Sequence, residues 1–215
     1  MPHLVLMGDS VFDNAAYVRG GPDVVRQARD RLGPDGWDAT LVAVDGAVTE
    51  GVRRQIARIP PDATHLVVSA GGNDALGSVD VLYRGARTVG AALAMLGDVV
   101  APFEARYRTM LGEVLARGLP TAVCTVYNPV FPDPEERRYA ALGLAVFNDA
   151  ILRVALEAGV PVLELRSICG SDEDFANPIE PSVIGGEKMV SAIATMLAEH
   201  DFTRKRTAIF GSAPA

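Results

Sequence analysis

Short hydrophobic runs alternate along the chain with longer stretches in which apolar residues recur every three or four positions. The short runs have the length and β-branched character of buried strands, and the longer stretches have helical spacing. This alternation is typical of β-α-β units, which build a parallel sheet with helices on both faces. The pattern predicts strands at His3–Met7, Ala39–Val44, His65–Ala70, Pro120–Val126 and Pro161–Leu165.

Helices are predicted between these strands and after the last one. Residues 14–33 are expected to form a short helix, a break at Gly20-Gly21-Pro22 and a second helix. The segment 76–103 is apolar and contains several glycines, and we expect a helical excursion that packs with the core, with cleft lining or membrane contact as alternatives. The other predicted helices cover residues 49–59, 104–118, 134–159 and 185–200.

These elements predict an α/β fold, a three-layer α/β/α sandwich with a five-stranded parallel sheet. The chain has 215 residues, which suffices for one domain with a full hydrophobic core, and we expect residues 1–215 to form a single domain.

Charge and cysteine content narrow the function classes. The net charge of -7 argues against a nucleic-acid-binding protein, and the only basic cluster, Arg204-Lys205-Arg206, is expected to be solvated. Cys124 and Cys169 lie in apolar runs, which favours buried free thiols over a disulfide or zinc site. We see no secretory signal and no apolar run of the ~20 residues needed to cross a bilayer, so we expect a cytoplasmic protein without a membrane span.

Three polar loops follow the first three predicted strands. Ligands of parallel sheets bind beyond the carboxyl ends of the strands, so these loops are expected to share one rim. Each loop alone has an ordinary structural explanation, as a helix cap, a tight turn or a flexible loop. Together they offer more, because the Ser10 N–H, the Gly46 N–H and the Asn73 amide could converge on an oxyanion, and such donors contribute ~3 kcal/mol each to acyl transfer. The loops are Gly8-Asp9-Ser10, Asp45-Gly46-Ala47 and Gly71-Gly72-Asn73-Asp74.

The stretches "LMGDS" with "VFDN", "VDGAVTEGV" and "VSAGGNDAL" occur in the order and at the spacing of the first three motif blocks of the SGNH (GDSL-type) esterases and lipases. The chain resembles this family over most of its length. The resemblance implies a flavodoxin-like fold, Ser10 as nucleophile, and an oxyanion hole formed by the Ser10 N–H, Gly46 and Asn73, with no cofactor and no metal. The Gly-x-Ser-x-Gly elbow of the other large group of α/β esterases is absent around Ser10.

The last block of the family, Asp-x-x-His-Pro followed by a glycine, is altered here. The matching stretch is "NPIEPSVIGG", which places Asn177 at the aspartate position and Glu180 at the histidine position. No other histidine substitutes for the missing base. His3 and His65 begin strands at the opposite end of the sheet, a strand length or ~17 Å away, and His200 ends the last helix.

Glu180 is therefore the candidate base. An ordinary glutamate is weaker than histidine by about two pKa units, or ~3 kcal/mol, but burial raises a carboxyl pKa. Asn177 fits this exchange, because its amide can donate to a carboxylate that an aspartate would repel. These residues predict a serine esterase for a small-molecule substrate with a small or medium acyl group.

Two alternatives stay open. The first is an inactive protein that binds an acyl, acetyl or sugar ligand in the oxyanion cradle. The second explains the last block as a simple loop, with Ser182 capping the final helix and Glu180 solvated. Four acidic residues near the rim could also participate, although their spacing does not support a metal site. They are Asp9, Asp13, Asp45 and Asp74.

Overall fold

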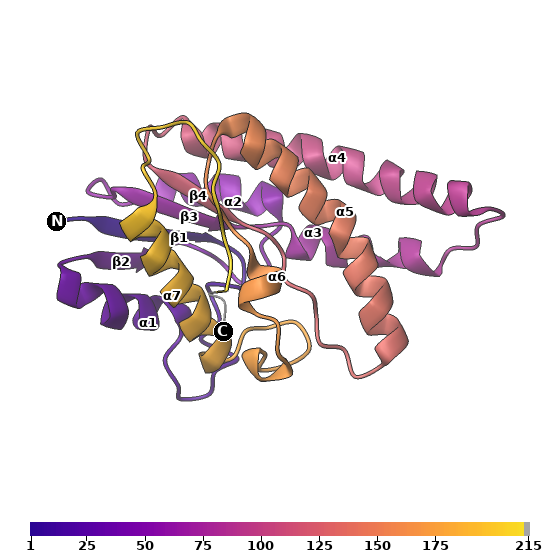
Figure 1. The fold of residues 1–215 in the computed structure, drawn as a ribbon, viewed down its shortest axis with the longest axis horizontal. Coiled ribbons are helices and arrows are strands. Elements are labelled where there is room, and N and C mark those ends of the chain that lie inside the picture. Colours follow the sequence, from indigo (N-terminus) through magenta and orange to yellow (C-terminus); the bar gives the residue numbers. More distant parts are fainter. Residues whose placement is uncertain (213–215) are drawn as a thin grey trace.

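The computed structural model describes residues 1–212, which form a parallel sheet between two layers of helices (Figure 1). The predicted α/β sandwich is confirmed, with a sixth short strand that sequence patterning missed. The strand order is β2-β1-β3-β4-β5-β6, and every pairing is parallel. The strands are β1 (His3–Gly8), β2 (Asp38–Leu41), β3 (His65–Ser69), β4 (Thr121–Cys124), β5 (Val162–Leu163) and β6 (Ile209–Phe210).

The helices cover the sheet on both faces. One core packs α1 and α7 against one face of the sheet, and a second packs α2, α4 and α5 against the other. Strand β1 shows why, since Leu4 and Leu6 enter the first core while Val5 and Met7 enter the second. The helices are α1 (Val24–Leu32), α2 (Thr49–Gln55), α3 (Gly72–Leu76), α4 (Val89–Leu115), α5 (Pro134–Ala158), α6 (Leu165–Ile168) and α7 (Val183–Glu199).

The chain changes direction across the sheet after β1. Strand β2 pairs with one edge of β1, and β3 pairs with the other. The connections from β1 and β2 therefore leave a crevice at the carboxyl end of β1, which is where open parallel sheets bind ligands. The loop that contains Ser10 begins at this point.

Segment 76–103 differs from its predicted packing. It contains the end of α3, the 3₁₀ turn η3 (Val79–Tyr83) and the first half of α4, which continues through Pro102. All residues from 83 to 94 are exposed, so this part does not join the core. The first halves of α4 and α5 instead extend beyond the sheet, toward the right of Figure 1. We call residues 76–103 the arm.

Other local predictions have mixed outcomes. Residues 14–19 form turns, and the predicted short helix there is wrong. Cys124 and Cys169 are buried and free, as expected. Helix α5 is long and apolar enough to cross a membrane by length and composition alone, but it packs beside α4 on the sheet, as core helices of this kind also do.

Candidate functional site

The site begins where β1 ends, at Gly8. Gly8 has φ = +127°, and a Cβ there would lie 1.8 Å from the Ser69 carbonyl oxygen. Only glycine permits this conformation and this approach of β1 to β3. The Gln55 side chain of α2 accepts from the Gly8 N–H at 2.8 Å and donates to the Gly8 carbonyl at 2.7 Å. The buried backbone is thus fully hydrogen-bonded at the point where the chain turns toward Ser10.

Ser10 opens onto a cavity of about 110 Å³. One end is polar and carries Ser10, Asn73 and Glu180, together with Asp9 and Ser69. The remaining walls are mainly apolar side chains from α3, η3, α4, α5 and the loop after β4. A small number of polar groups at one end of an apolar cavity is the usual arrangement of a small-molecule site.

Glu180 lies beside Ser10 in this cavity. Ser10 is 8% exposed and Glu180 is 6% exposed, so the loop interpretation with a solvated glutamate is wrong. Burial raises the pKa of Glu180, and a hydrogen bond with the Ser10 side chain partly offsets that rise. Among residues 1–212, the Glu180 Oε2 atom has no hydrogen-bond partner. A carboxylate held beside a hydroxyl in apolar surroundings is a stronger base than one in water.

Asn177 acts on the Glu180 backbone, which differs from the predicted contact with the carboxylate. The Asn177 Oδ1 atom accepts from the N–H groups of Ile179 and Glu180, each at 3.0 Å. Because both partners are donors, the amide oxygen must face them. Asn177 therefore shapes the turn that presents Glu180. Ser182 caps α7 as predicted, accepting from the Gly185 N–H at 3.2 Å.

Two further side chains hold the loop around Glu180. The buried Asn14 amide donates to the Pro181 carbonyl at 3.2 Å, and the Tyr127 hydroxyl donates to the Ile179 carbonyl at 2.7 Å. The two residues flanking Glu180 are thus fixed from the first motif block and from the end of β4. Sequence reasoning did not assign these roles, although Asn14 belongs to the quoted "VFDN" stretch.

The three oxyanion-hole candidates lie in adjacent loops. The Asn73 amide donates to the Ala47 carbonyl at 3.1 Å, which leaves its second hydrogen for a ligand. Gly46 has φ = +75°, is exposed and does not line the cavity. Within the described chain, the N–H groups of Ser10 and Gly46 donate to no protein acceptor. Ser10 and Asn73, which line the cavity, therefore each keep a free donor, whereas the free Gly46 N–H lies outside the cavity lining.

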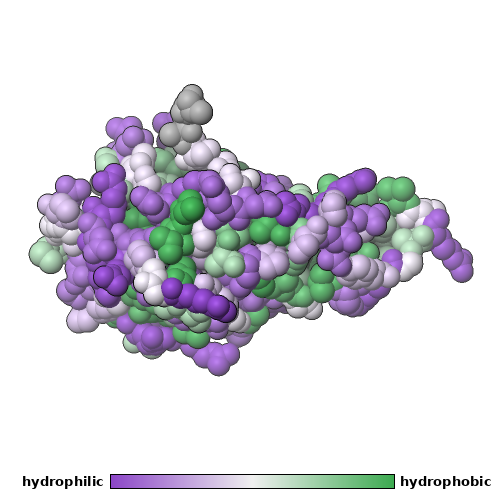
Figure 2. All heavy atoms as spheres, turned by 90° about the horizontal axis from the view of Figure 1, so that it is seen from below, coloured by the Kyte–Doolittle hydropathy of each residue, from purple (hydrophilic) through white to green (hydrophobic). Residues whose placement is uncertain are grey.

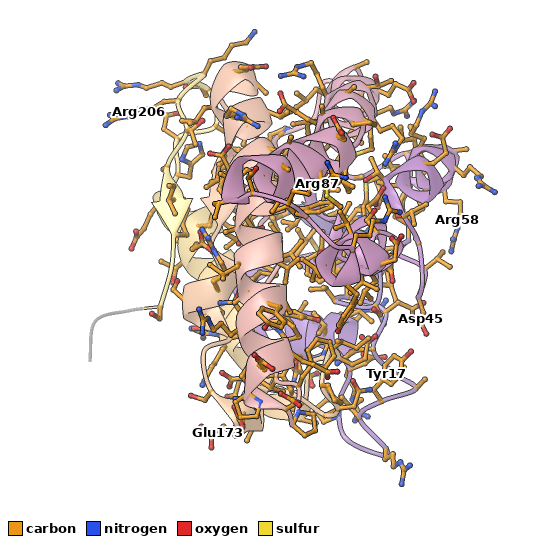
Figure 3. All side chains as sticks on the ribbon, turned by 90° about the vertical axis from the view of Figure 1, so that its right-hand side faces the viewer. Tyr17, Asp45, Arg58, Arg87, Glu173 and Arg206 are labelled. Atoms are coloured by element: carbon orange, nitrogen blue, oxygen red, sulfur yellow. The ribbon has the colours of Figure 1, made fainter. Side chains whose placement is uncertain are left out.

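Of the four acidic rim candidates, only Asp9 lines the cavity. Asp13 accepts from the Asp45 N–H at 2.9 Å, and Asp45 accepts from the Tyr17 hydroxyl at 2.7 Å, a pair visible in Figure 3. Asp74 accepts from the Thr49 N–H and hydroxyl at 2.8 and 2.9 Å. These three carboxylates join loops together. No group of three metal-ligating side chains occurs in residues 1–212.

Asp9 itself is 3% exposed beneath the nucleophile. Its Oδ1 atom accepts from the Val11 N–H and from the Ser69 hydroxyl, both at 3.2 Å. Burial, assisted by the charge of Glu180, raises the pKa of Asp9 to about 7. Asp9 is therefore mostly protonated in mildly acidic solution, which limits the negative charge near the site.

The backbone just after β4 is hydrogen-bonded by a helix side chain, as the backbone at the end of β1 is. Asn148, which is fully buried on α5, accepts from the Val126 N–H at 2.7 Å and donates to the Val126 carbonyl at 2.8 Å. A single amide side chain thus occupies the place of a neighbouring strand. Sequence periodicity alone did not reveal Gln55 or Asn148, because a buried amide on a helix resembles an ordinary interruption of its apolar face.

Comparison with known proteins agrees with this geometry. No functionally curated protein matches the chain in sequence. Among solved structures, a lipolytic G-D-S-L family protein from Veillonella parvula is 14% identical, with a TM-score of 0.68 and coverage of 93% of this chain and 100% of that one. Phospholipase A1 from Streptomyces albidoflavus is 15% identical, with a TM-score of 0.65 and coverage of 93% and 99%.

A lipase/acylhydrolase from Enterococcus faecalis is 18% identical, with a TM-score of 0.63 and coverage of 92% and 95%. At these identities the likeness establishes the fold. The family model described as "GDSL-like Lipase/Acylhydrolase family" matches residues 6–182, which include Ser10, Gly46, Asn73 and Glu180. The chain therefore belongs to the GDSL-like lipase/acylhydrolase family of ester hydrolases.

Proposed function

We propose that this protein is a serine esterase in which Glu180 serves as the base. The observation that carries the proposal is that the buried side chains of Ser10 and Glu180 line the same polar end of an apolar cavity. The proposed substrate is a carboxylic ester with a small or medium acyl group, and no cofactor takes part.

In the first half of the reaction, Ser10 Oγ attacks the ester carbonyl carbon while its proton passes to Glu180. The carbonyl oxygen becomes an oxyanion that the N–H groups of Ser10 and Gly46 and the free hydrogen of the Asn73 amide stabilise. The tetrahedral intermediate then collapses, the bond to the alcohol oxygen breaks, and protonated Glu180 returns the proton to that oxygen. The product of this half is an acyl-Ser10 ester.

In the second half, a water molecule takes the place of the alcohol. Glu180 accepts a proton from this water as the water attacks the acyl carbonyl. The second oxyanion that forms is stabilised by the same donors as the first. Collapse of that intermediate breaks the bond to Ser10 Oγ and returns the proton to it. Burial supports this role, because it raises the pKa of Glu180 toward the range in which a carboxylate accepts protons effectively.

The proposal is tested with aryl esters. Ser10→Ala is expected to abolish hydrolysis, and Glu180→Gln, which keeps shape and burial, is expected to lower kcat by roughly 10²–10⁴-fold. Glu187→Gln, at an exposed position in the same stretch of chain, is the matched control and should behave as wild type. Mass spectrometry of the quenched reaction should detect the acyl group on the peptide that contains Ser10.

Two results would count against the proposal. Full activity in Glu180→Gln with none in Ser10→Ala would retain the nucleophile and eliminate the base. Absence of hydrolysis for every ester, with ligand binding retained in Ser10→Ala, would favour the binding protein instead.

A further inference from the structure

The tip of the arm, residues 83–94, is an apolar surface that the rest of the described chain leaves uncovered. Every residue in this range is exposed, and Val89 and Leu93 are 78% and 62% exposed near the start of α4. Tyr83, at the end of η3, is 65% exposed. Figure 2 shows hydrophobic residues gathered on the narrow part of the molecule that projects to the right. A contiguous exposed apolar patch is typical of an interaction surface.

A stripe of apolar residues connects the tip with the site. Four residues of α4 recur at spacings of four, three and four, which places them on one helix face: Val89, Leu93, Leu96 and Val100. Val100 is buried in the core, and Leu96 lines the cavity that Ser10 opens onto. The other two are exposed. On this face, the apolar surface runs unbroken from the core past the cavity to the tip.

The charge of the tip differs from that of the whole chain. The chain carries a net charge of -7, but residues 81–97 contain no aspartate or glutamate and two arginines, Arg84 and Arg87. Arg84 pairs with Asp80, and no acidic partner of Arg87 occurs among the described residues. Figure 3 looks onto this end of the molecule and labels Arg87. Apolar, aromatic and basic side chains together are typical of segments that lie in a membrane interface.

A lipid surface fits the tip better than a second copy of this chain does. A stable protein interface takes about 20–30 residues from each partner, more than the tip offers. A two-fold pairing of two tips would also bring their arginines together, and like charges across an interface repel. A lipid surface needs no complementary shape, because apolar side chains have only to enter the boundary between headgroups and acyl chains.

The projection of the arm sets how the molecule would approach such a surface. The first half of α4 extends beyond the sheet (Figure 1), and its axis advances ~17 Å from Val89 to Val100 at about 1.5 Å per residue. Interactions between exposed charges are largely screened beyond ~8 Å at physiological ionic strength. The carboxylates of the body are therefore repelled only weakly by an anionic surface that Arg87 is close enough to contact.

We propose that the tip of the arm docks on the surface of an anionic lipid bilayer, with Val89 and Leu93 inserted and Arg87 at the headgroup phosphates. The arm lies on the bilayer without crossing it, since α4 continues into the core of the protein. Docking goes beyond ester hydrolysis, because it needs neither Ser10 nor Glu180.

Co-sedimentation with vesicles tests the insertion of apolar side chains. Wild type is expected to bind vesicles of equal parts phosphatidylcholine and phosphatidylglycerol at least about fivefold more strongly than vesicles of pure phosphatidylcholine. Leu93→Gln should lower binding to both kinds of vesicle roughly fivefold, since it removes an inserted apolar side chain. Leu156→Gln is the matched control and should bind as wild type, because Leu156 is also 62% exposed and lies at the end of α5 away from the arm.

A second pair of variants tests the role of charge. Arg87→Gln should lower binding to the anionic vesicles roughly fivefold and leave binding to pure phosphatidylcholine unchanged. Arg117→Gln, at an exposed position just after the opposite end of α4, is the control and should bind as wild type. Ser10→Ala should also bind as wild type, so the result does not depend on whether any ester is hydrolysed.

Three results would overturn the docking proposal and leave the esterase proposal intact. They are no binding to either kind of vesicle, equal binding to both, and equal losses in Leu93→Gln and Leu156→Gln. Sedimentation velocity without lipid covers the second copy. Wild type is expected to be a monomer, and a dimer that Leu93→Gln dissociates would show that the tip binds another copy of the chain and would overturn the proposal as well.

Discussion

Replacing Asp9 by asparagine is expected to remove a specific dependence of stability on pH. Asp9 is buried, and its pKa rises from 3.8 to about 7 on folding. Between these two pH values the folded state holds a proton that the unfolded state has released. Because the folded state binds more protons, the free energy of unfolding decreases as pH rises through this window.

The size of the effect follows from the pKa difference. A shift of about three units corresponds to roughly 4 kcal/mol, of which about 3 kcal/mol is lost between pH 5 and pH 8. The neutral amide introduced by Asp9→Asn would mimic the protonated acid, because its oxygen can still accept from the Val11 N–H and the Ser69 hydroxyl. The Asp9→Asn variant should therefore gain about 3 kcal/mol relative to wild type as pH rises from 5 to 8.

Urea unfolding at several pH values, followed by circular dichroism, measures this difference. Asp30→Asn, at an exposed position on α1, is the control and should track wild type at every pH. A stability difference between Asp9→Asn and wild type that stays constant or shrinks with pH would refute the reasoning, since it would mean that Asp9 is ionised throughout the window.

Two other substitutions probe the framework of the site. Gln55→Leu leaves the buried Gly8 N–H without a partner, while the Gly8 carbonyl still accepts from the Val44 N–H at 3.0 Å, so thermal or urea unfolding should show a loss of about 1–3 kcal/mol. A loss below about 0.5 kcal/mol would mean that water replaces the amide. Asn177→Ala removes the side chain that shapes the turn before Glu180, so kcat for aryl esters should fall about tenfold with KM nearly unchanged. If the variant is partly unfolded at the assay temperature, and the unfolded fraction accounts for the whole decrease in kcat, the effect is general destabilisation and the prediction is wrong.

The parts of the fold that were predictable from sequence are those set by local chemistry. Buried β-branched runs and helical spacing located five of the six strands and most helices, since burial on both faces leaves a continuous apolar run. Strand β6 has two residues, Ile209 and Phe210, and a pair of apolar residues has no detectable period. The rule that parallel strands end at one rim, together with the order of the motif blocks, also led us to expect Ser10 and Glu180 in one crevice.

Other features depended on tertiary geometry that residue types do not encode. Apolar composition is the same for a core helix and for a helix that lines an open cavity, so the packing of the arm could not be settled from its residues. Position in the motif pointed to Asn177 as a partner of Glu180, but an amide can donate or accept, and only the turn geometry decides between backbone and carboxylate.

The side-chain amides of Gln55 and Asn148, which bond the backbone at the ends of β1 and β4, also affect how fast different parts of the cavity can move. The amide hydrogens of Gly8 and Val126 are each bonded to a buried side chain of a packed helix, Gln55 or Asn148. They can exchange with solvent only when α2 or α5 detaches, an opening that approaches global unfolding in free energy. Residues 83–94 are exposed and can open locally at far lower cost. The reacting end of the cavity is consequently expected to be more rigid than the exposed segment that joins its lining residues Leu82 and Leu96.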